Sequence, residues 1–174
     1  MALLKNRKYR KGFSLLELML VLGVITGLIV SAFMIYPKAQ AAQRAEIEVK
    51  NITAIQAGVK ALYTSAPNYS GLNNTVALNA NIFPDSMLSG GGNERKIVNS
   101  FKGDVDLIAS GNIFYIVYYS VPSAECVRLL YAVRNNFNTV VINGLGVTAQ
   151  SNDYDLVSKK CSSTEKNKLM FISS

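Results

Sequence analysis

The sequence contains no histidine and only two cysteines in 174 residues. Histidine is the side chain that most often serves as general base or metal ligand near neutral pH, so the commonest catalytic arrangements are excluded. Two pairs of carboxylates stand close together on expected loops, Asp104 with Asp106 and Asp153 with Asp155. Such pairs can ligate calcium weakly, but solvated turn residues are the commoner case. We therefore expect no catalytic residue, no cofactor-binding or metal-binding residue, and no enzymatic activity.

Acidic residues are missing from the start of the chain, which accounts for much of the net charge of +7. The first twelve residues carry five of the 18 basic side chains: Lys5, Arg7, Lys8, Arg10 and Lys11. The rest of the chain is close to neutral. Composition therefore does not indicate a basic face for nucleic acid, although a local patch is allowed.

A long apolar run follows this basic segment, from Gly12 to Tyr36, and its about 24 residues are enough to span a bilayer core. Glu17 is the one charge in the run. A carboxylate there costs roughly 2.5–3.5 kcal/mol on insertion scales, so it must reach the interface or find a partner. Glu17 is about 6 Å of helix rise from Phe13, which puts the interface within reach.

The order of these features resembles the class III signal of type IV pilins and related pseudopilins: a basic leader, Gly12, then Phe13-Ser14-Leu15-Leu16-Glu17 and an apolar helix. The resemblance implies that a prepilin peptidase cuts between Gly12 and Phe13 and methylates the Phe13 amine, giving N-methylphenylalanine. Glu17 then becomes the fifth residue of the mature chain. The alternative is an ordinary signal peptide or signal anchor that happens to carry a glutamate, but no small-residue site closes an apolar core of about 7–15 residues, as a cleaved signal peptide requires.

The helix is expected to continue beyond Pro37, where a kink or local unwinding is predicted. From Ala39 to Ser65 the sequence predicts an amphipathic helix with a buried seam. The seam comprises Ala42, Ala45, Val49, Ile52, Ile55, Val59 and Leu62, with Arg44, Glu48 and Asn51 expected on the opposite side. In the first half, Gly23, Gly27 and Ser31 place small residues every four positions. This spacing favours close helix packing, but it also fits glycines that merely loosen a membrane helix.

The sequence of the remainder of the chain predicts a domain with both helices and strands. Pro67 to Asn81 is expected to be a surface connection, and Asn81 to Leu88 a short helix. Strands are expected at 105–109, 112–121, 139–142 and 168–172, and a helix from about Ser123, its expected cap, to Asn135. The fold class is α+β. Resemblance to the pilin fold implies that an antiparallel sheet packs on the C-terminal half of the long helix, whose apolar half protrudes.

The two cysteines, Cys126 and Cys161, fall in the part expected to be exported, where oxidising conditions favour a disulfide. Closing a loop of about 35 residues stabilises the fold by roughly 4 kcal/mol in the chain-entropy model. Two unrelated buried thiols are the alternative. A cysteine pair near the C-terminus also resembles the disulfide of many pilins.

Four segments are therefore expected: a leader at 1–12, a membrane and filament-core helix at 13–36, the amphipathic half of that helix at 37–65, and a globular head at 66–174. The positive leader keeps the N-terminus in the cytoplasm and sends the head across the membrane. Phe13 as first mature residue and the short leader resemble those of type IVa pilins. The larger head, the cysteine spacing and the stretch from Val121 to Cys126 more closely resemble those of type IVb pilins.

The resemblance implies a major pilin, stored in the inner membrane and polymerised into an extracellular fibre for adhesion, motility, conjugation or DNA uptake. Its expected partners are other copies in a helical filament, the prepilin peptidase, an assembly ATPase with its inner-membrane platform, an outer-membrane secretin and, before assembly, membrane lipid. The alternatives are a minor pilin or type II secretion pseudopilin, with DNA or a receptor as ligand, and an anchored binding module that never polymerises.

Overall fold

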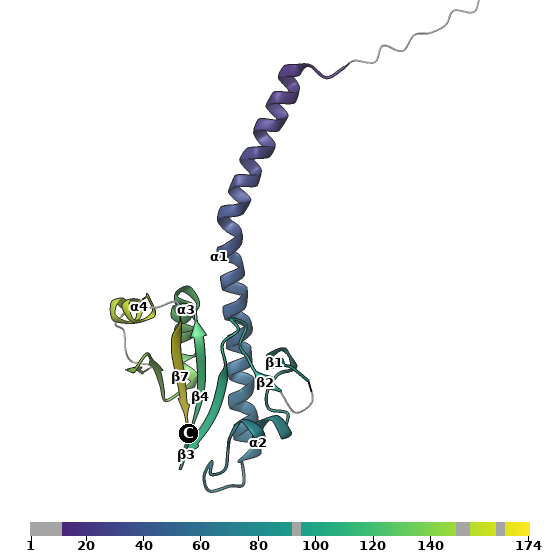
Figure 1. Ribbon diagram of the computed structural model, residues 1–174. Helices are drawn as coiled ribbons and strands as arrows, with labels where there is room; N and C mark the ends of the chain where they lie inside the picture. The colour runs from purple at the N-terminus through teal and green to yellow at the C-terminus, as the bar shows by residue number, and fades with distance from the viewer. Residues whose placement is uncertain (1–11, 92–94, 149–153, 163–165) are drawn as a thin grey trace, which may run out of the picture. The chain divides into compact units, whose positions relative to one another are not determined.

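The computed structural model describes residues 12–91, 95–148, 154–162 and 166–174, and Figure 1 shows its helices and strands. The chain forms two compact units, one ending at Ala39 and the other running from Gln40 to Ser174. The second unit contains the sheet and the hydrophobic core. The expected strand and helix segments of the head all fall within this unit.

The long helix α1 spans Leu15–Leu62, 48 residues. It is continuous through Pro37, so the predicted local unwinding there is wrong. A proline removes one backbone donor and disturbs the turn before it, and the turns on either side can remain helical. The helix begins two residues after Phe13 and ends three before Ser65, which is the usual uncertainty at helix ends.

The second half of α1 is amphipathic, as predicted, but its buried face is wider than the predicted seam. Ala45, Ile52, Ile55 and Val59 are buried, whereas Ala42 and Leu62, at the two ends of the seam, are exposed. Glu48 and Asn51 are only 0% and 6% exposed, so their predicted position on the opposite side was wrong. Glu48 lies three residues after Ala45 and four before Ile52, and helical geometry places these residues on one face.

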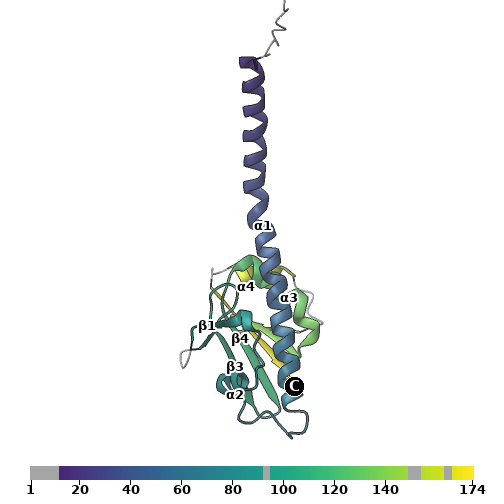
Figure 2. The same ribbon diagram turned by 90° about the vertical axis from the view of Figure 1, so that its right-hand side faces the viewer.

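A five-stranded sheet forms the second layer within the described residues, in the order β3-β4-β7-β5-β6. Its strands are β3 (Val105–Ser110), β4 (Ile113–Val121), β5 (Thr139–Ile142), β6 (Leu145–Val147) and β7 (Asn167–Ser173). All neighbouring strands are antiparallel. The second half of α1 runs across one face of this sheet (Figure 2). The predicted α+β fold, with an antiparallel sheet packed on the helix, is confirmed.

The core forms because alternate residues of the central strands point toward α1. On β4 these are Phe114, Ile116 and Tyr118, each 0% exposed. Phe171 of β7 meets Tyr118 edge-on, with ring centroids 5.7 Å apart. Helix α3 (Ser123–Val133) adds Leu129, Leu130 and Val133 to the same core. Burying a side chain of this size contributes about 1.5–3 kcal/mol relative to leaving it exposed, so these residues stabilise the head.

Several connections differ from the expected loops. Helix α2 (Asn74–Asn79) lies inside the predicted surface connection, and its N-cap, Asn73, accepts a hydrogen bond from the amide of Val76 at 3.0 Å. The helix expected at 81–88 is only the short 3-10 turn η1 (Asp85–Met87). It leads into β1 (Leu88–Ser89), which pairs with β2 (Lys96–Ile97). The sequence prediction treated asparagine only as a loop residue, although it is also a preferred N-cap.

The elements after β4 agree better with the prediction. Helix α3 begins at Ser123 with Pro122 as its N-cap, one residue earlier than expected, and a 3-10 turn, η3 (Arg134–Asn136), follows it. Strand β6 and helix α4 (Tyr154–Ser162) were not predicted. Asn143 and Gly144 join β5 to β6 with φ values of 48° and 90°. A two-residue turn of this kind needs positive φ at both positions, which Asn-Gly supplies.

Tyr118 generates a prediction about alkaline stability. Burial raises the pKa of Tyr118 well above its usual 10.0, and the nearby carboxylate of Glu48 raises it further. In the unfolded chain the phenol ionises near its usual pKa, whereas in the fold it stays protonated, so stability falls as the pH rises above about 10. The loss approaches about 1.4 kcal/mol per pH unit for one such group.

We predict that Tyr118→Phe flattens this alkaline loss. The measurement is the free energy of unfolding in urea, for the full chain in detergent, between about pH 9 and pH 11.5. Tyr115→Phe is the matched control, because Tyr115 is only half-buried and lies on the other face of β4. If Tyr118→Phe kept the slope of the parent, Tyr118 would not be the group responsible.

Candidate assembly site and disulfide

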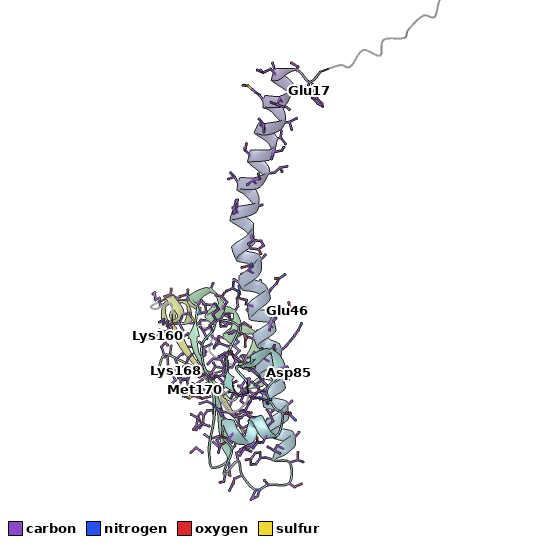
Figure 3. The ribbon with its side chains drawn as sticks, turned by 45° about the vertical axis from the view of Figure 1, so that its right-hand side comes forward. Glu17, Glu46, Asp85, Lys160, Lys168 and Met170 are labelled. Atoms are coloured by element: carbon purple, nitrogen blue, oxygen red, sulfur yellow. A yellow bond between two sulfur atoms is a disulfide. The ribbon has the colours of Figure 1, made fainter. Side chains whose placement is uncertain are left out.

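The residues predicted to act in processing and assembly lie at the start of the described chain. Gly12 and Phe13 precede α1, and the Phe13 side chain is 81% exposed. Glu17 lies in the first turn of α1 (Figure 3) and is exposed. None of the described residues forms an ion pair with Glu17. Carboxylates are favoured in a first helical turn because the backbone amides there are unpaired and the helix dipole is positive.

The helix that follows Glu17 is apolar on all sides. Leu15–Phe33 is, by length and composition, the segment of the described chain able to cross a membrane, and none of it is buried. Its hydroxyl groups are satisfied within the helix: Thr26 donates to the carbonyl of Gly23 at 2.9 Å, and Ser31 to that of Gly27 at 2.7 Å. Glu17 is thus the polar side chain of this segment that its own backbone does not satisfy.

Among the described residues, none packs against the glycines of this segment. A Cβ built on Gly23 or Gly27 would meet nothing within 4 Å. Gly58, in the second half of α1, is different, because a Cβ there would lie 3.1 Å from Cγ2 of Ile82. Packing inside the subunit therefore explains Gly58 but not the two glycines of the apolar half.

The acidic pairs do not form a cluster with other ligands in the described part of the chain, where no group of three or more potential metal-binding side chains occurs. Asp106 is in β3 rather than in a loop, and its Oδ1 accepts a hydrogen bond from Asn74 at 3.0 Å. Asp155 pairs with Lys159 on the exposed surface of α4. Asp153 lies outside the described residues.

The predicted disulfide is confirmed. Cys126 and Cys161 are joined with an S–S distance of 2.05 Å and a Cα–Cα distance of 5.8 Å, and both are fully buried. Cys126 is in the first turn of α3, as predicted, and Cys161 is near the end of α4. The bond therefore connects α3 to α4.

Two asparagines reinforce this region, and the sequence prediction missed both. The side chain of Asn167, 0% exposed, donates to the carbonyls of Val121 and Cys161, each at 3.0 Å. Its Oδ1 accepts from the side chain of Asn143 at 2.8 Å, and Oδ1 of Asn143 accepts from the amide of Lys168 at 2.9 Å. One buried amide thus links α4, β4 and the β5–β6 turn. No sequence pattern marks an asparagine as buried.

The sheet face away from α1 is partly apolar. Ile108 of β3 is 48% exposed and lies opposite Tyr115, which in turn lies opposite Ile172. Lys168 and Met170 follow each other along β7 (Figure 3), and Nζ of Lys168 is 5.1 Å from the centre of the Tyr119 ring. An antiparallel sheet usually presents a polar face to water. This face instead combines apolar and basic side chains.

The long helix, the antiparallel sheet on its second half and the disulfide define a pilin-like subunit. A family model described as PilS N terminal matches residues 42–174, and the chain belongs to this family. Among solved structures, the chain is similar to a type IV b pilin from Salmonella typhi, with a TM-score of 0.59, 19% identity, and coverage of 72% of this chain and 97% of that one. It is also similar to TcpA, a type IV pilin from Vibrio cholerae El Tor biotype, with a TM-score of 0.52, 16% identity, and coverage of 76% and 99%.

Curated relatives agree with the structures. The chain is 25% identical over 151 residues to the major structural subunit of bundle-forming pilus from Escherichia coli O111:H-, covering 84% of this chain and 76% of the relative. The same subunit from Escherichia coli O127:H6 gives the same values. The predicted resemblance to type IV pilins, nearer to type IVb than to type IVa, is confirmed.

The disulfide generates a prediction about stability. We predict that Cys126→Ser lowers the free energy of unfolding by roughly 2–5 kcal/mol, the range for small secreted domains, while leaving export intact. Urea unfolding of the full chain in detergent measures the loss.

Cys161→Ser and the double variant Cys126→Ser/Cys161→Ser are the controls, and both should lose about as much stability as the single change, because one bond is removed in each case. Reaction of both cysteines of the native protein with a thiol reagent, without reductant, would disprove the bond.

Proposed function

We propose that this chain is the major structural subunit of a type IV pilus, held in the inner membrane and then polymerised into a surface fibre. The observation that carries the proposal is the apolar half of α1. It is exposed on every side, while its one charged side chain, Glu17, pairs with none of the described residues. Such a helix needs lipid or other helices around it.

Copies of the same helix are the neighbours that best suit this segment. In lipid there is little hydrophobic gain from association, so close packing and polar pairing decide whether helices associate. No described residue lies within 4 Å of a Cβ built on Gly23 or Gly27, which supports a close approach by another helix. A head-to-tail contact that does not close generates a fibre.

The segments of the chain then take distinct roles. Residues 1–12 are the leader that the prepilin peptidase removes, 13–36 the membrane anchor and later the filament core, 37–65 the amphipathic half of the helix, and 66–174 the head. Before assembly the N-terminus is cytoplasmic and the head lies across the membrane. Assembly involves an ATPase with its inner-membrane platform and an outer-membrane secretin, and the role of the subunit is structural rather than catalytic.

Glu17 and the amine of Phe13 form the assembly contact in this proposal. In the membrane the carboxylate reaches the interface, but between packed helices a charge must be paired. Cleavage after Gly12 creates a cationic amine four residues from Glu17. If neighbouring subunits are offset along the fibre, Glu17 of one subunit pairs with the Phe13 amine of another. The pair then sets the stagger and makes processing a precondition for assembly.

A minor pilin or type II secretion pseudopilin is the second candidate. It would share the leader and the helix but would initiate or adapt a fibre rather than build it. The relatives named as major structural subunits favour the first candidate. The relative amount of this chain in sheared fibres, seen on a protein gel, distinguishes the two, because a major subunit dominates the preparation.

The processing step gives the first prediction. We expect the mature chain to begin at Phe13 and to carry one added methyl group, which intact-mass measurement of membrane or fibre protein detects. Gly12→Val should block cleavage, because the peptidase is expected to need a small residue at the cut, whereas Gly12→Ala should be processed. A mature chain that begins elsewhere would count against the proposed processing.

Glu17 gives the second prediction. Glu17→Ala should insert, be cleaved and accumulate, but fibre yield should fall by roughly tenfold or more, because the Phe13 amine would lack its partner in the fibre. Glu17→Asp, which keeps the charge, should retain part of the yield. Shearing of cells that express only the variant, followed by a protein gel, gives the yield. Normal fibres from Glu17→Ala would rule out the pairing mechanism.

A further inference from the structure

A hollow of about 390 Å³ lies where α2, β2 and the start of β3 meet. Small-molecule sites in proteins occupy roughly 300–1,000 Å³, so this hollow is large enough for a small ligand. It lies within the second compact unit of the chain, and none of its lining residues is among those assigned to processing or assembly.

Charges of both signs line the hollow. Arg95 and Lys96, both exposed, come from β2 and the residue before it. Asp104 and Asp106 come from β3 and the residue before it. In the described part of the chain, no ion pair joins either cation to either carboxylate. The hollow therefore presents a cationic pair and an anionic pair that do not neutralise each other.

The two pairs are separated because β2 and β3 diverge. An isolated antiparallel bridge joins Val98 to Asp104. Beyond this bridge the two segments do not pair with each other, since β2 pairs with β1 and β3 pairs with β4. Lys96 and Asp106 each lie two residues beyond the bridge, on the two segments that border the hollow.

Apolar side chains accompany these charges in the lining. Ile97 and Val105 are 5% and 1% exposed, and Leu78 of α2 is half-buried. Ligand sites in proteins commonly combine an apolar lining with a few placed polar groups. A ligand that fits here has an aliphatic part for these three side chains and a charged group for each of the two pairs.

One of the carboxylates is already held in place by the fold. Nδ2 of Asn74, the first residue of α2, donates to Oδ1 of Asp106 at 3.0 Å. Oδ1 of Asn74 accepts from the amide of Leu107 at 2.7 Å, so Asn74 is itself fixed to β3. Asp106 is half-buried, and its Oδ2 remains to accept from a ligand. A group that is ordered before binding loses less conformational entropy when the ligand arrives.

We propose that this hollow binds an ω-amino carboxylate, a ligand with an ammonium group at one end, a carboxylate at the other and an aliphatic chain between them. The ammonium group pairs with Asp104 and Asp106, and the carboxylate pairs with Arg95 and Lys96. The chain contacts the apolar part of the lining. An α-amino acid does not fit this arrangement, because its two charges are adjacent. The proposal concerns the single subunit and does not depend on how subunits assemble.

Titration of the full chain in a nonionic detergent with ε-aminocaproate tests the site, followed by the amide chemical shifts of residues 95–97 and 104–106. Both segments should show saturable shifts with the same dissociation constant. Caproate lacks the ammonium group and hexylamine lacks the carboxylate, so each should bind roughly tenfold more weakly or worse. Alanine, with adjacent charges, should also bind more weakly. Added salt should weaken the binding of ε-aminocaproate.

A second ligand separates two sources of this chemistry. Nα-acetyl-lysine carries the ammonium group and the carboxylate of a peptide that ends in lysine. If it binds as tightly as ε-aminocaproate, the hollow accepts the end of a peptide chain. If it binds more weakly while ε-aminocaproate saturates the site, the ligand is a free small molecule.

Variants of the two charged pairs test the assignment of the residues. Asp106→Asn and Lys96→Gln should each weaken the binding of ε-aminocaproate by roughly tenfold or more, because each removes one charged partner. Asp104→Asn replaces Asp106→Asn if that variant does not fold. The matched controls are Asp85→Asn and Lys102→Gln, at exposed positions that do not line the hollow (Figure 3 labels Asp85), and both should bind as the parent does.

Several results would overturn the proposal. One is the absence of saturable shifts up to the solubility limit of ε-aminocaproate. Another is equal binding of caproate and ε-aminocaproate, or unchanged binding in both Asp106→Asn and Lys96→Gln. Shifts of the same residues when the chain is diluted without ligand would show that another copy of the chain fills the hollow, which also contradicts a small-ligand site.

Discussion

The structure depends on one helix, α1, whose two halves suit different surroundings. The first half of α1 carries apolar side chains on every side and satisfies its hydroxyl groups internally, as a helix in lipid requires. The second half buries a single face against the sheet, with Ile52, Ile55 and Val59 fully enclosed. Because the apolar pattern changes from all-round to one-sided near Pro37, the same helix can serve as an anchor and as the central element of a soluble core.

The apolar half of the helix and the central strands could be predicted because they depend on the properties of residues close together in the sequence. The apolar run after Gly12 and the β-branched and aromatic residues of β4 are patterns that local propensity and periodicity make visible. Helix α4 is harder to find, since it is short and, of its described side chains, only Val157 and Cys161 are buried. Strand order could not be predicted because it depends on pairing between residues far apart, such as β4 with β7.

The candidate site divides in the same way. Gly12, Phe13 and Glu17 stand in a contiguous motif, so a single sequence can point to them, whereas Glu48 looks like any solvent-facing glutamate of an amphipathic helix. Its burial follows from the phase of the helix against the sheet and from the Asn99–Gly103 turn that supplies its donors. The sequence prediction assumed that a charged side chain faces water. This holds for most glutamates, but not for one whose carboxylate accepts hydrogen bonds from donors inside the core.

Several asparagine side chains of this head form hydrogen bonds between elements, as backbone groups do between neighbouring strands. Asn74 donates to Asp106 and accepts from the amide of Leu107 at 2.7 Å, so it occupies part of the outer edge of β3 as a neighbouring strand would. Asn99 closes its turn onto β4, and Asn167 joins β4 to α4. Each carries both donors and an acceptor on one short side chain. The asparagines that indicate loops in the sequence therefore also link the elements of the head. Substitution of any of them by aspartate would remove the two amide donors and place a charge where the structure holds a neutral amide.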